Sequence, residues 1–277
     1  LVVKKGEVLV VQAGDPPKDA AEFVAATKKR AEPTAMASSG TGSIPHLAIQ
    51  QLADATGAKL AIESAHMMAD IAVIVPQLAV TVPPLVTAET GIDALAHCVE
   101  AFTNARAHPT VDLYAREGIG LIGRYLRRAV EHGDDLEARA GMALAALYGG
   151  YCLGPVNTAG GHAVAYPLST QHGIGHGRAN AIIFPHMLAY NAPVASERTR
   201  EIVQLLGLGE ASGEQVCSAA SAFCADLGMA MRLTAHGIKA GHIEAMAAGA
   251  AGIRRLLDNN PRPMSGRDIA AIYHAAL

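Results

Sequence analysis

The most constraining stretch of the chain runs from Thr87 to Thr103 and has the sequence TAETGIDALAHCVEAFT. It follows a diproline, and its apolar residues recur at helical spacing, so we predict a helix with Thr87 as its N-cap. Asp93 and His97 stand four residues apart and therefore project from one face of this helix. A carboxylate and an imidazole placed in this way can bind one divalent metal ion. The alternative is an i,i+4 hydrogen bond on a solvated helix face.

Two further histidines extend this pattern. They lie in the segment GGHAVAYPLSTQHGIGHGRANA, with His162 in an apolar run and His176 after a glycine-rich turn. With the first pair they make one carboxylate and three imidazoles. This donor set suits Fe(II) or Zn(II) and does not suit calcium, which takes all-oxygen ligands.

These motifs resemble those of the iron-dependent (group III) alcohol dehydrogenases, in the dehydroquinate synthase-like superfamily. The helix motif of that family, roughly TGxDALxHxxEA, is matched by residues 90–101. Its second signature, roughly HAxAHPL followed by HGxANAxxLPH, is matched by residues 162–168, with one departure, and by residues 176–186. By position, the resemblance implies four metal ligands: Asp93, His97, His162 and His176.

The resemblance implies an oxidoreductase that interconverts an alcohol and an aldehyde or ketone with NAD or NADP. The metal would polarise the carbonyl oxygen while the nicotinamide delivers hydride to the carbon. The alternatives are a hydroxyacid–oxoacid transhydrogenase, a maleylacetate reductase-like enzyme, and a metal-binding protein that has lost its cofactor site. A purely structural metal is disfavoured because structural zinc mostly uses cysteine, and no cysteine stands at these four positions.

One departure from the family pattern concerns proton transfer. Many members carry a second histidine, proposed as a proton relay, four residues after the first histidine of the second signature, and here that position is Tyr166. A phenol can donate a proton if a nearby cation lowers its pKa from about 10, so we predict Tyr166 as a catalytic residue. His172 and His186 flank the ligand segment, and we expect each to support a metal ligand or to pack in the fold, in preference to binding metal.

Residues 1–85 are predicted to form a dinucleotide-binding α/β region that is Rossmann-like, shortened and incomplete. Strands are predicted over residues 8–12, 33–37 and 69–75, and a helix over residues 19–29, an alternation that favours a parallel, doubly wound sheet. The family's GGGSxxD loop, which approaches the cofactor pyrophosphate, is absent. The short connection between Lys29 and Pro33 reads as though a block of the sheet were missing.

A glycine-rich segment is the nearest candidate for cofactor contacts. Residues 39–43 resemble the family segment TTAGTGSE, which lines the cofactor cleft, although Ile44 stands in place of its final glutamate. An ordinary flexible turn is the alternative. The cofactor-binding residues implied by the resemblance are Ser38, Gly40, Thr41, Gly42 and Lys59.

Residues 86–277 are predicted to form an all-helical, metal-binding catalytic domain. Pro167 is expected to end one helix and Pro185 to kink or restart another. Ser265 and Asp268 should form a variant capping box. After the first helix, the predicted helices cover residues 110–131, 134–151, 159–166, 177–191, 197–206, 213–227, 243–257 and 265–276.

Composition argues against several classes of protein. A chain of 277 residues, 51% of them hydrophobic, can bury a substantial core. A net charge of −3 without a basic stripe argues against nucleic acid as a partner. The most apolar window, residues 71–86, contains three prolines and is too short to cross a bilayer. The four cysteines form no CxxC pair and are expected to be free thiols. These properties favour a cytoplasmic protein. The resemblance implies that it is an enzyme with a small-molecule substrate and that it forms a homodimer.

Overall fold

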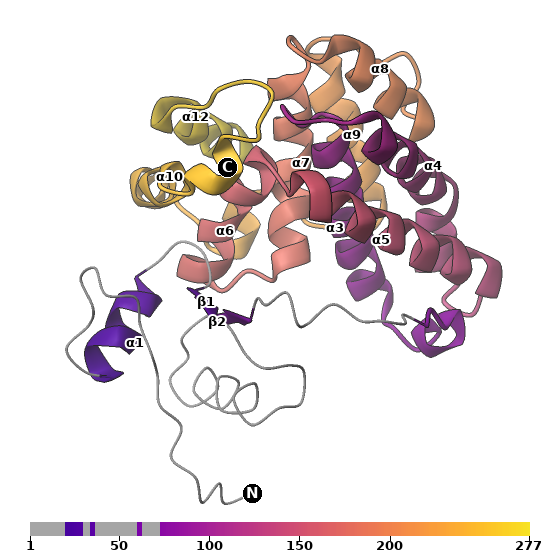
Figure 1. The fold of residues 1–277 in the computed structure, drawn as a ribbon, viewed down its shortest axis with the longest axis horizontal. Helices are drawn as coiled ribbons and strands as arrows, with labels where there is room; N and C mark the ends of the chain where they lie inside the picture. Colours follow the sequence, from indigo (N-terminus) through magenta and orange to yellow (C-terminus); the bar gives the residue numbers. More distant parts are fainter. Residues whose placement is uncertain (1–19, 30–33, 37–59, 63–72) are drawn as a thin grey trace, which may run out of the picture. The chain divides into compact units, whose positions relative to one another are not determined.

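The computed structural model describes residues 20–29, 34–36, 60–62 and 73–277 (Figure 1). The chain divides into two compact units, Leu1–Ala72 and Val73–Leu277. The regular elements of the second unit are all helices, which confirms the predicted all-helical C-terminal region. The assignment of residues 1–85 to cofactor binding and of residues 86–277 to catalysis stays a prediction.

In the first unit the structure describes helix α1 (Ala20–Lys28) and strands β1 (Thr34–Met36) and β2 (Leu60–Ile62). The two strands pair in parallel, the arrangement typical of α/β folds. Helix α1 and strand β1 confirm the predictions over residues 19–29 and 33–37. Strand β2 was not predicted, because three residues are too few for a period-two pattern to stand out. The strand predicted over residues 8–12 lies outside the described residues.

The strand predicted over residues 69–75 is wrong in its described part, residues 73–75. Val75 has an extended backbone, with φ −121° and ψ 93°, but these three residues join no sheet among the described residues. Val73 is 76% exposed. Valine and isoleucine favour an extended backbone, but a strand also needs a hydrogen-bonded neighbour.

The helices of the second unit account for most of the described chain (Figure 1). Their bounds are η2 (Pro76–Ala79), α3 (Pro84–Phe102), α4 (Pro109–Glu131), α5 (Leu136–Val156), α6 (Gly160–His172), α7 (His176–Asn191), α8 (Ser196–Leu205), α9 (Gln215–Asp226), η3 (Leu233–His236), η4 (Ala240–His242), α10 (Ile243–Ala251), α11 (Arg254–Leu257) and α12 (Gly266–Ala276). The helix predicted over residues 243–257 is therefore two helices, separated at Gly252 and Ile253. The capping box predicted at Ser265 and Asp268 is formed.

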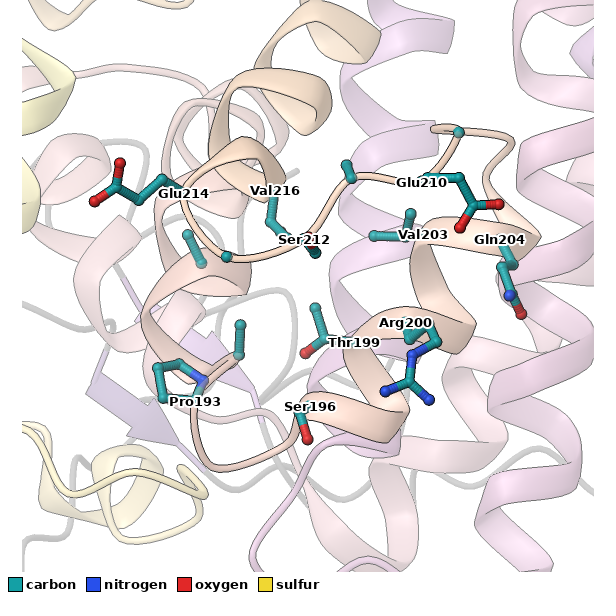
Figure 2. Close-up of a pocket in the computed structure, with 15 residues that line it drawn as sticks. Pro193, Ser196, Thr199, Arg200, Val203, Gln204, Glu210, Ser212, Glu214 and Val216 are labelled. Carbon is teal, nitrogen blue, oxygen red and sulfur yellow. The ribbon is translucent and has the colours of Figure 1, made fainter.

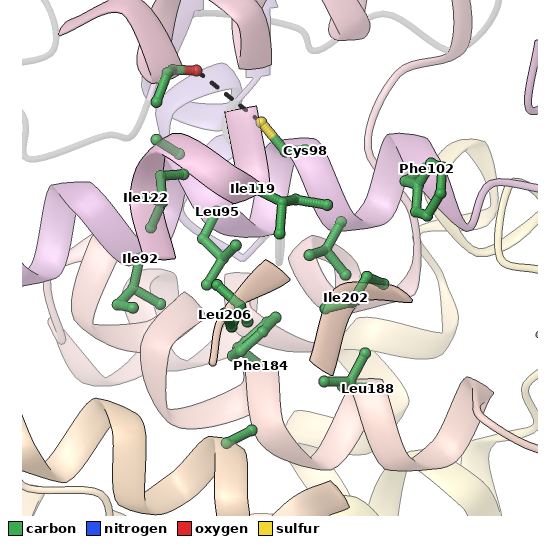
Figure 3. Packing of buried hydrophobic residues seen from close by; sticks show 14 of the residues in the cluster. Ile92, Leu95, Cys98, Phe102, Ile119, Ile122, Phe184, Leu188, Ile202 and Leu206 are labelled. Carbon is green, nitrogen blue, oxygen red and sulfur yellow. Dashed lines mark hydrogen bonds between the residues drawn. The ribbon is translucent and has the colours of Figure 1, made fainter. Parts of the chain in front are cut away.

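Helix α3 lies within the second unit and packs against α4, α5, α6 and α7. Its buried side chains, among them Leu95 and Phe102, belong to one cluster with Ile119 of α4, Phe184 of α7 and Ile202 of α8 (Figure 3). Burial on several sides makes α3 a rigid element, because side chains in a packed core have little room to move. It is the element from which Asp93 and His97 project.

Helix α3 begins earlier than predicted. Its first residue is Pro84, so the predicted N-cap at Thr87 is wrong. Proline suits the first helical position because its φ is already helical and a backbone N–H there would have no helical partner. The Thr87 hydroxyl instead donates to the backbone oxygen of Pro83 at 3.1 Å and accepts from Arg139 at 2.8 Å.

Pro167 and Pro185 lie inside helices and do not end them. Helix α6 was predicted to end before Pro167 but continues to His172, and α7 runs through Pro185 to Asn191. Each proline removes one backbone hydrogen bond. Both prolines are buried, and packing of α6 and α7 against each other and their neighbours offsets that loss.

The four cysteines are free thiols, as predicted. Cys98 follows His97 but points into the core, where its Sγ lies 4.0 Å from the backbone oxygen of Ala145 (Figure 3). Burial raises the pKa of the Cys98 thiol far above its usual value. Among the described helices, none has the length and apolar character needed to span a membrane.

The buried guanidinium of Arg139 leads to a prediction about stability. Arg139 is 4% exposed and donates to Thr87 Oγ1 at 2.8 Å, to the Gly133 oxygen at 2.8 Å and to the Val82 oxygen at 3.1 Å. Lysine keeps the charge but lacks the planar fork that reaches three acceptors at once. We expect Arg139→Lys to lower the free energy of unfolding by about 1 kcal/mol, measured by urea denaturation.

The matched control is Arg127→Lys. Arg127 pairs with Asp226 on an exposed surface, so its replacement should change the free energy of unfolding by less than about 0.5 kcal/mol. Equal stability of the two variants would contradict a structural role for Arg139.

Candidate metal centre

Helix α3 presents three polar side chains on one face. Asp93, His97 and Glu100 follow the spacing i, i+4, i+7, which aligns side chains along one side of a helix. Asp93 and His97 are half-buried and Glu100 is 8% exposed. The opposite side of α3 is in the apolar core, so this face is the polar one.

Helices α6 and α7 supply the other two predicted ligands. His162 is the third residue of α6 and is 2% exposed, and His176 is the first residue of α7. Both helices pack against α3, which brings His162 and His176 to its polar face.

Three of the four predicted ligands converge. Asp93, His162 and His176 each offer one ligand atom, and these atoms all lie within 4.8 Å of one another. Asp93 Oδ1 is 3.5 Å from His162 Nε2 and 3.5 Å from His176 Nε2. Bonds of about 2.0–2.1 Å at tetrahedral angles separate ligand atoms by about 3.4 Å, so this spacing suits one small divalent ion.

His97 lies at the edge of this group. Its Nε2 is 4.0 Å from Asp93 Oδ1, and its ring stacks on that of His162 with centroids 4.9 Å apart. It is therefore adjacent to the three converging side chains but stands slightly farther from the carboxylate than the other two imidazoles.

The ring of His162 has a defined orientation. Its Nδ1 lies 2.7 Å from Glu100 Oε1, and the ring is buried. Its Nε2 is buried and makes no hydrogen bond to any residue that the structure describes. An unpaired buried nitrogen is costly unless something binds it. A cation between His162 Nε2 and Asp93 would satisfy both groups, so the residues present fit a metal.

The pKa values of the site follow from burial and charge. Burial raises the pKa of Asp93, but its contact with His162 and the charge of the nearby imidazoles outweigh this, and the pKa falls to about 2. Burial and the neighbouring His162 lower the pKa of His97 to about 4, and burial also lowers that of His176. For His162, burial is outweighed by Glu100 and Asp93, and the pKa rises. The site therefore combines the carboxylates of Asp93 and Glu100 with three imidazoles, a set of groups that favours binding of a cation.

Asn180 belongs to the site but was not predicted. It is 2% exposed, its Nδ2 donates to Asp93 Oδ1 at 2.6 Å, and the same nitrogen lies 3.1 Å from His176 Nε2. The amide therefore holds two candidate ligands toward each other. The signal was available in the sequence, since Asn180 follows His176 by four residues and shares its helix face.

Glu100 was also missed. It occupies the next turn of α3 after His97, and extending the i,i+4 pattern by three residues would have found it. Its carboxylate contacts the ring of His162.

The predicted catalytic residue lies beside the centre. Tyr166 follows His162 by one turn of α6, and its ring centroid is 5.9 Å from that of His176 and 6.5 Å from that of His162. Its predicted role in proton transfer stays a prediction. The five predicted cofactor-binding residues, Ser38, Gly40, Thr41, Gly42 and Lys59, lie outside the described residues.

The flanking histidines lie apart from the metal group. The ring of His172 packs on that of His242 with centroids 4.9 Å apart. His186 Nδ1 lies 3.6 Å from the Cys217 thiol. These contacts correspond to the packing role, one of the two roles expected from the sequence.

A separate cavity of about 680 Å³ lies between the end of α7, α8 and the loop that leads to α9 (Figure 2). Its walls combine apolar side chains such as Val203 and Val216 with Arg200, Glu210 and Glu214. None of the candidate metal ligands lines it, so it is distinct from the metal centre.

Comparison with known sequences identifies the family. Residues 87–277 match the sequence model of the Fe-containing alcohol dehydrogenase family, C-terminal region. Long-chain-alcohol dehydrogenase 1 of Geobacillus thermodenitrificans is 38% identical over 245 residues, which cover 86% of this chain and 61% of that protein.

Solved structures agree with the sequence comparison. A 1,3-propanediol oxidoreductase superposes with a TM-score of 0.69 and 32% identity, covering 79% of this chain and 56% of the other. Sulfoacetaldehyde reductase from Bifidobacterium kashiwanohense, solved in complex with NAD+, gives a TM-score of 0.70 and 26% identity, covering 78% of this chain and 56% of the other. The chain thus spans less than two thirds of the length of these relatives. It belongs to the Fe-containing alcohol dehydrogenase family.

Proposed function

We propose that this chain holds the metal of a nicotinamide-dependent oxidoreductase that interconverts an alcohol and an aldehyde or ketone. The observation that carries the proposal is the convergence of Asp93, His162 and His176 within 4.8 Å. Relatives named as alcohol dehydrogenases, and the related structure solved with NAD+, support this activity.

Asp93, His97, His162 and His176 would hold the metal. One oxygen and three nitrogen donors suit Fe(II) or Zn(II), and donor type alone does not separate the two ions. The rigid placement of Asp93 on buried α3 and of His162 in the interior would keep these donors oriented. Asn180 would steady Asp93 and His176 through the contacts described above.

A bound metal would supply Lewis acidity toward the substrate oxygen, and a nicotinamide would accept or supply hydride at the adjacent carbon. The residues of this chain would position those groups. Tyr166, beside His176 and one turn from His162, would hold and pass a proton at its phenol oxygen. Burial of His162 would keep water away from one side of the centre.

Cofactor binding is proposed from sequence. The resemblance of residues 39–43 to the family's cofactor-lining segment supports NAD or NADP contacts at Ser38, Gly40, Thr41, Gly42 and Lys59. A small-molecule alcohol or aldehyde is the proposed substrate. Cytoplasmic location and a homodimer stay predictions.

The first experiment separates metal binding from hydride transfer. The full chain is treated with a chelator, titrated with Fe(II) under anaerobic conditions or with Zn(II), and then titrated with NADH or NADPH while nicotinamide fluorescence is followed. We expect one equivalent of metal and saturable binding of one nucleotide. When NAD+ or NADP+ is then supplied together with a 1-alkanol or 1,3-propanediol, we expect reduction of the nicotinamide.

The other outcomes are informative. One equivalent of metal without saturable nucleotide binding would favour a metal-binding protein that has lost its cofactor site. Absence of stoichiometric metal would remove the ligand assignment itself. Metal and nucleotide binding with turnover only on hydroxyacids, or on maleylacetate, would favour the transhydrogenase or reductase alternative.

A further inference from the structure

The side chain of Glu100 joins two helices at the metal centre. It projects from α3, is 8% exposed, and reaches the beginning of α6. Its Oε2 accepts from the backbone N–H of Ala159, and its Oε1 accepts from the backbone N–H of His162 at 3.1 Å. The N-cap residue of α6, Ala159, has no side chain that can cap the helix, and the first turn of α6 contains no acid. Glu100 therefore supplies from another helix the acceptor that α6 lacks.

The same carboxylate determines which nitrogen of His162 carries a proton. His162 Nδ1 lies 2.7 Å from Glu100 Oε1, close enough for a short, charge-assisted hydrogen bond. Ionised carboxylate oxygens only accept hydrogen bonds, so Nδ1 must be the donor. In the neutral ring the lone pair is then on Nε2, the nitrogen that lies 3.5 Å from Asp93 Oδ1.

A glycine leaves room for this contact. A Cβ on Gly161 would overlap Glu100 Oε1 and lie 3.1 Å from the carboxyl carbon. Any other residue at this position would push the carboxylate away from Ala159 and His162.

We propose that Glu100 is the positioning residue of the metal centre, holding His162 with Nδ1 protonated and Nε2 directed at the site where Asp93 and His176 converge. This inference rests on the proposed metal site. A carboxylate behind a metal-binding histidine fixes the tautomer and orientation of its ring, and loss of such a partner weakens metal binding about 10–100-fold.

The informative variant is Glu100→Gln, which keeps the shape of the side chain. Three N–H groups point at the Glu100 carboxylate, and an amide offers only one acceptor oxygen. At least one of these donors would lose its acceptor, or the amide would donate to Nδ1 and move the ring proton to Nε2. We expect Glu100→Gln to weaken Zn(II) binding, measured by calorimetry, by about 10–100-fold. The control is Glu117→Gln, which changes an exposed glutamate on α4 and should leave the affinity unchanged.

A second readout does not need the metal. In the chelator-treated wild-type protein, proton NMR should show the Nδ1–H of His162 as a downfield signal protected from exchange with water. The signal is assigned by its absence in His162→Gln. In Glu100→Gln it should move upfield or exchange rapidly, and in Glu117→Gln it should not change.

The outcomes separate this inference from the proposed function. If wild-type protein binds no metal, the proposed metal site fails whatever Glu100 does. If wild-type protein binds Zn(II) and Glu100→Gln binds it equally well, Glu100 is not a positioning residue. An unprotonated Nδ1 in wild-type protein would overturn the inference even if Glu100→Gln failed to fold.

Discussion

Replacing Asp93 by alanine is expected to strip the protein of its bound metal. Asp93 Oδ1 lies within 4.0 Å of Nε2 of His97, His162 and His176, and Asp93 is the only carboxylate among the four candidate ligands. Loss of a residue behind a metal ligand weakens binding about 10–100-fold, so loss of the anionic ligand should weaken it by more than about 100-fold. Titration of Zn(II) into the chelator-treated variant measures this change. Dehydrogenase activity should fall with metal content.

The matched control for Asp93→Ala is Asp226→Ala. Asp226 is an exposed carboxylate paired with Arg127 at 3.0 Å, far along the chain from the candidate ligands. Its replacement should leave metal affinity unchanged. Circular dichroism and thermal unfolding of both metal-free variants separate loss of a ligand from loss of the fold. Wild-type metal affinity in Asp93→Ala would show that Asp93 is not a ligand.

The second large effect is expected at Gly123, where α4 meets the end of α8. A Cβ on Gly123 would overlap the backbone oxygen of Leu205 and lie 3.1 Å from Leu206 Cα. Backbone atoms cannot rotate aside as a flexible side chain does, so the two helices would have to separate. Overpacking of this kind costs up to about 3 kcal/mol. Alanine regains about 1 kcal/mol through helix propensity, so we expect Gly123→Ala to lower the free energy of unfolding by about 2 kcal/mol.

Gly120→Ala, one turn earlier on α4, is the control. The nearest atom to its added Cβ would be Leu205 Cδ2 at 3.6 Å, an ordinary van der Waals contact. This variant should therefore raise the free energy of unfolding by up to about 1 kcal/mol. In urea denaturation, the midpoint of Gly123→Ala should be lower than that of the wild type, and the midpoint of Gly120→Ala should be higher. Equal midpoints would contradict the close approach of α4 and α8.

Local features of the fold were predictable where a few neighbouring residues decide them. The capping box at Ser265 and Asp268 was identified from four residues, and the helical periodicity of residues 110–131 predicted α4 almost to its ends. The ends of α3 and α6 were not predicted correctly. Thr87 has the right chemistry for an N-cap and Pro167 for a helix stop, but the diproline starts α3 earlier and packing carries α6 onward.

In the metal centre too, local sequence patterns predicted some features, and others depend on contacts between helices. Spacing along one helix placed Asp93 and His97 on a common face, and motif resemblance selected His162 and His176 as their companions. Glu100 and Asn180 were missed because their importance depends on what faces them from other helices. A glutamate on a helix has no distinguishing local pattern until the beginning of α6 is placed against it.

The sequence by itself therefore determined the helical character of residues 86–277, the shared face of Asp93 and His97, and the set of candidate donors. Tertiary structure alone decided that Asp93, His162 and His176 converge, that His162 turns Nδ1 toward Glu100, and that Asn180 bridges two candidate ligands. The physical reason is the sequence separation between the residues that interact. Helical periodicity and capping depend on residues within one or two helical turns of each other. The hydrogen bonds between α3, α6 and α7 depend instead on the packing of apolar helix faces that come from distant parts of the sequence.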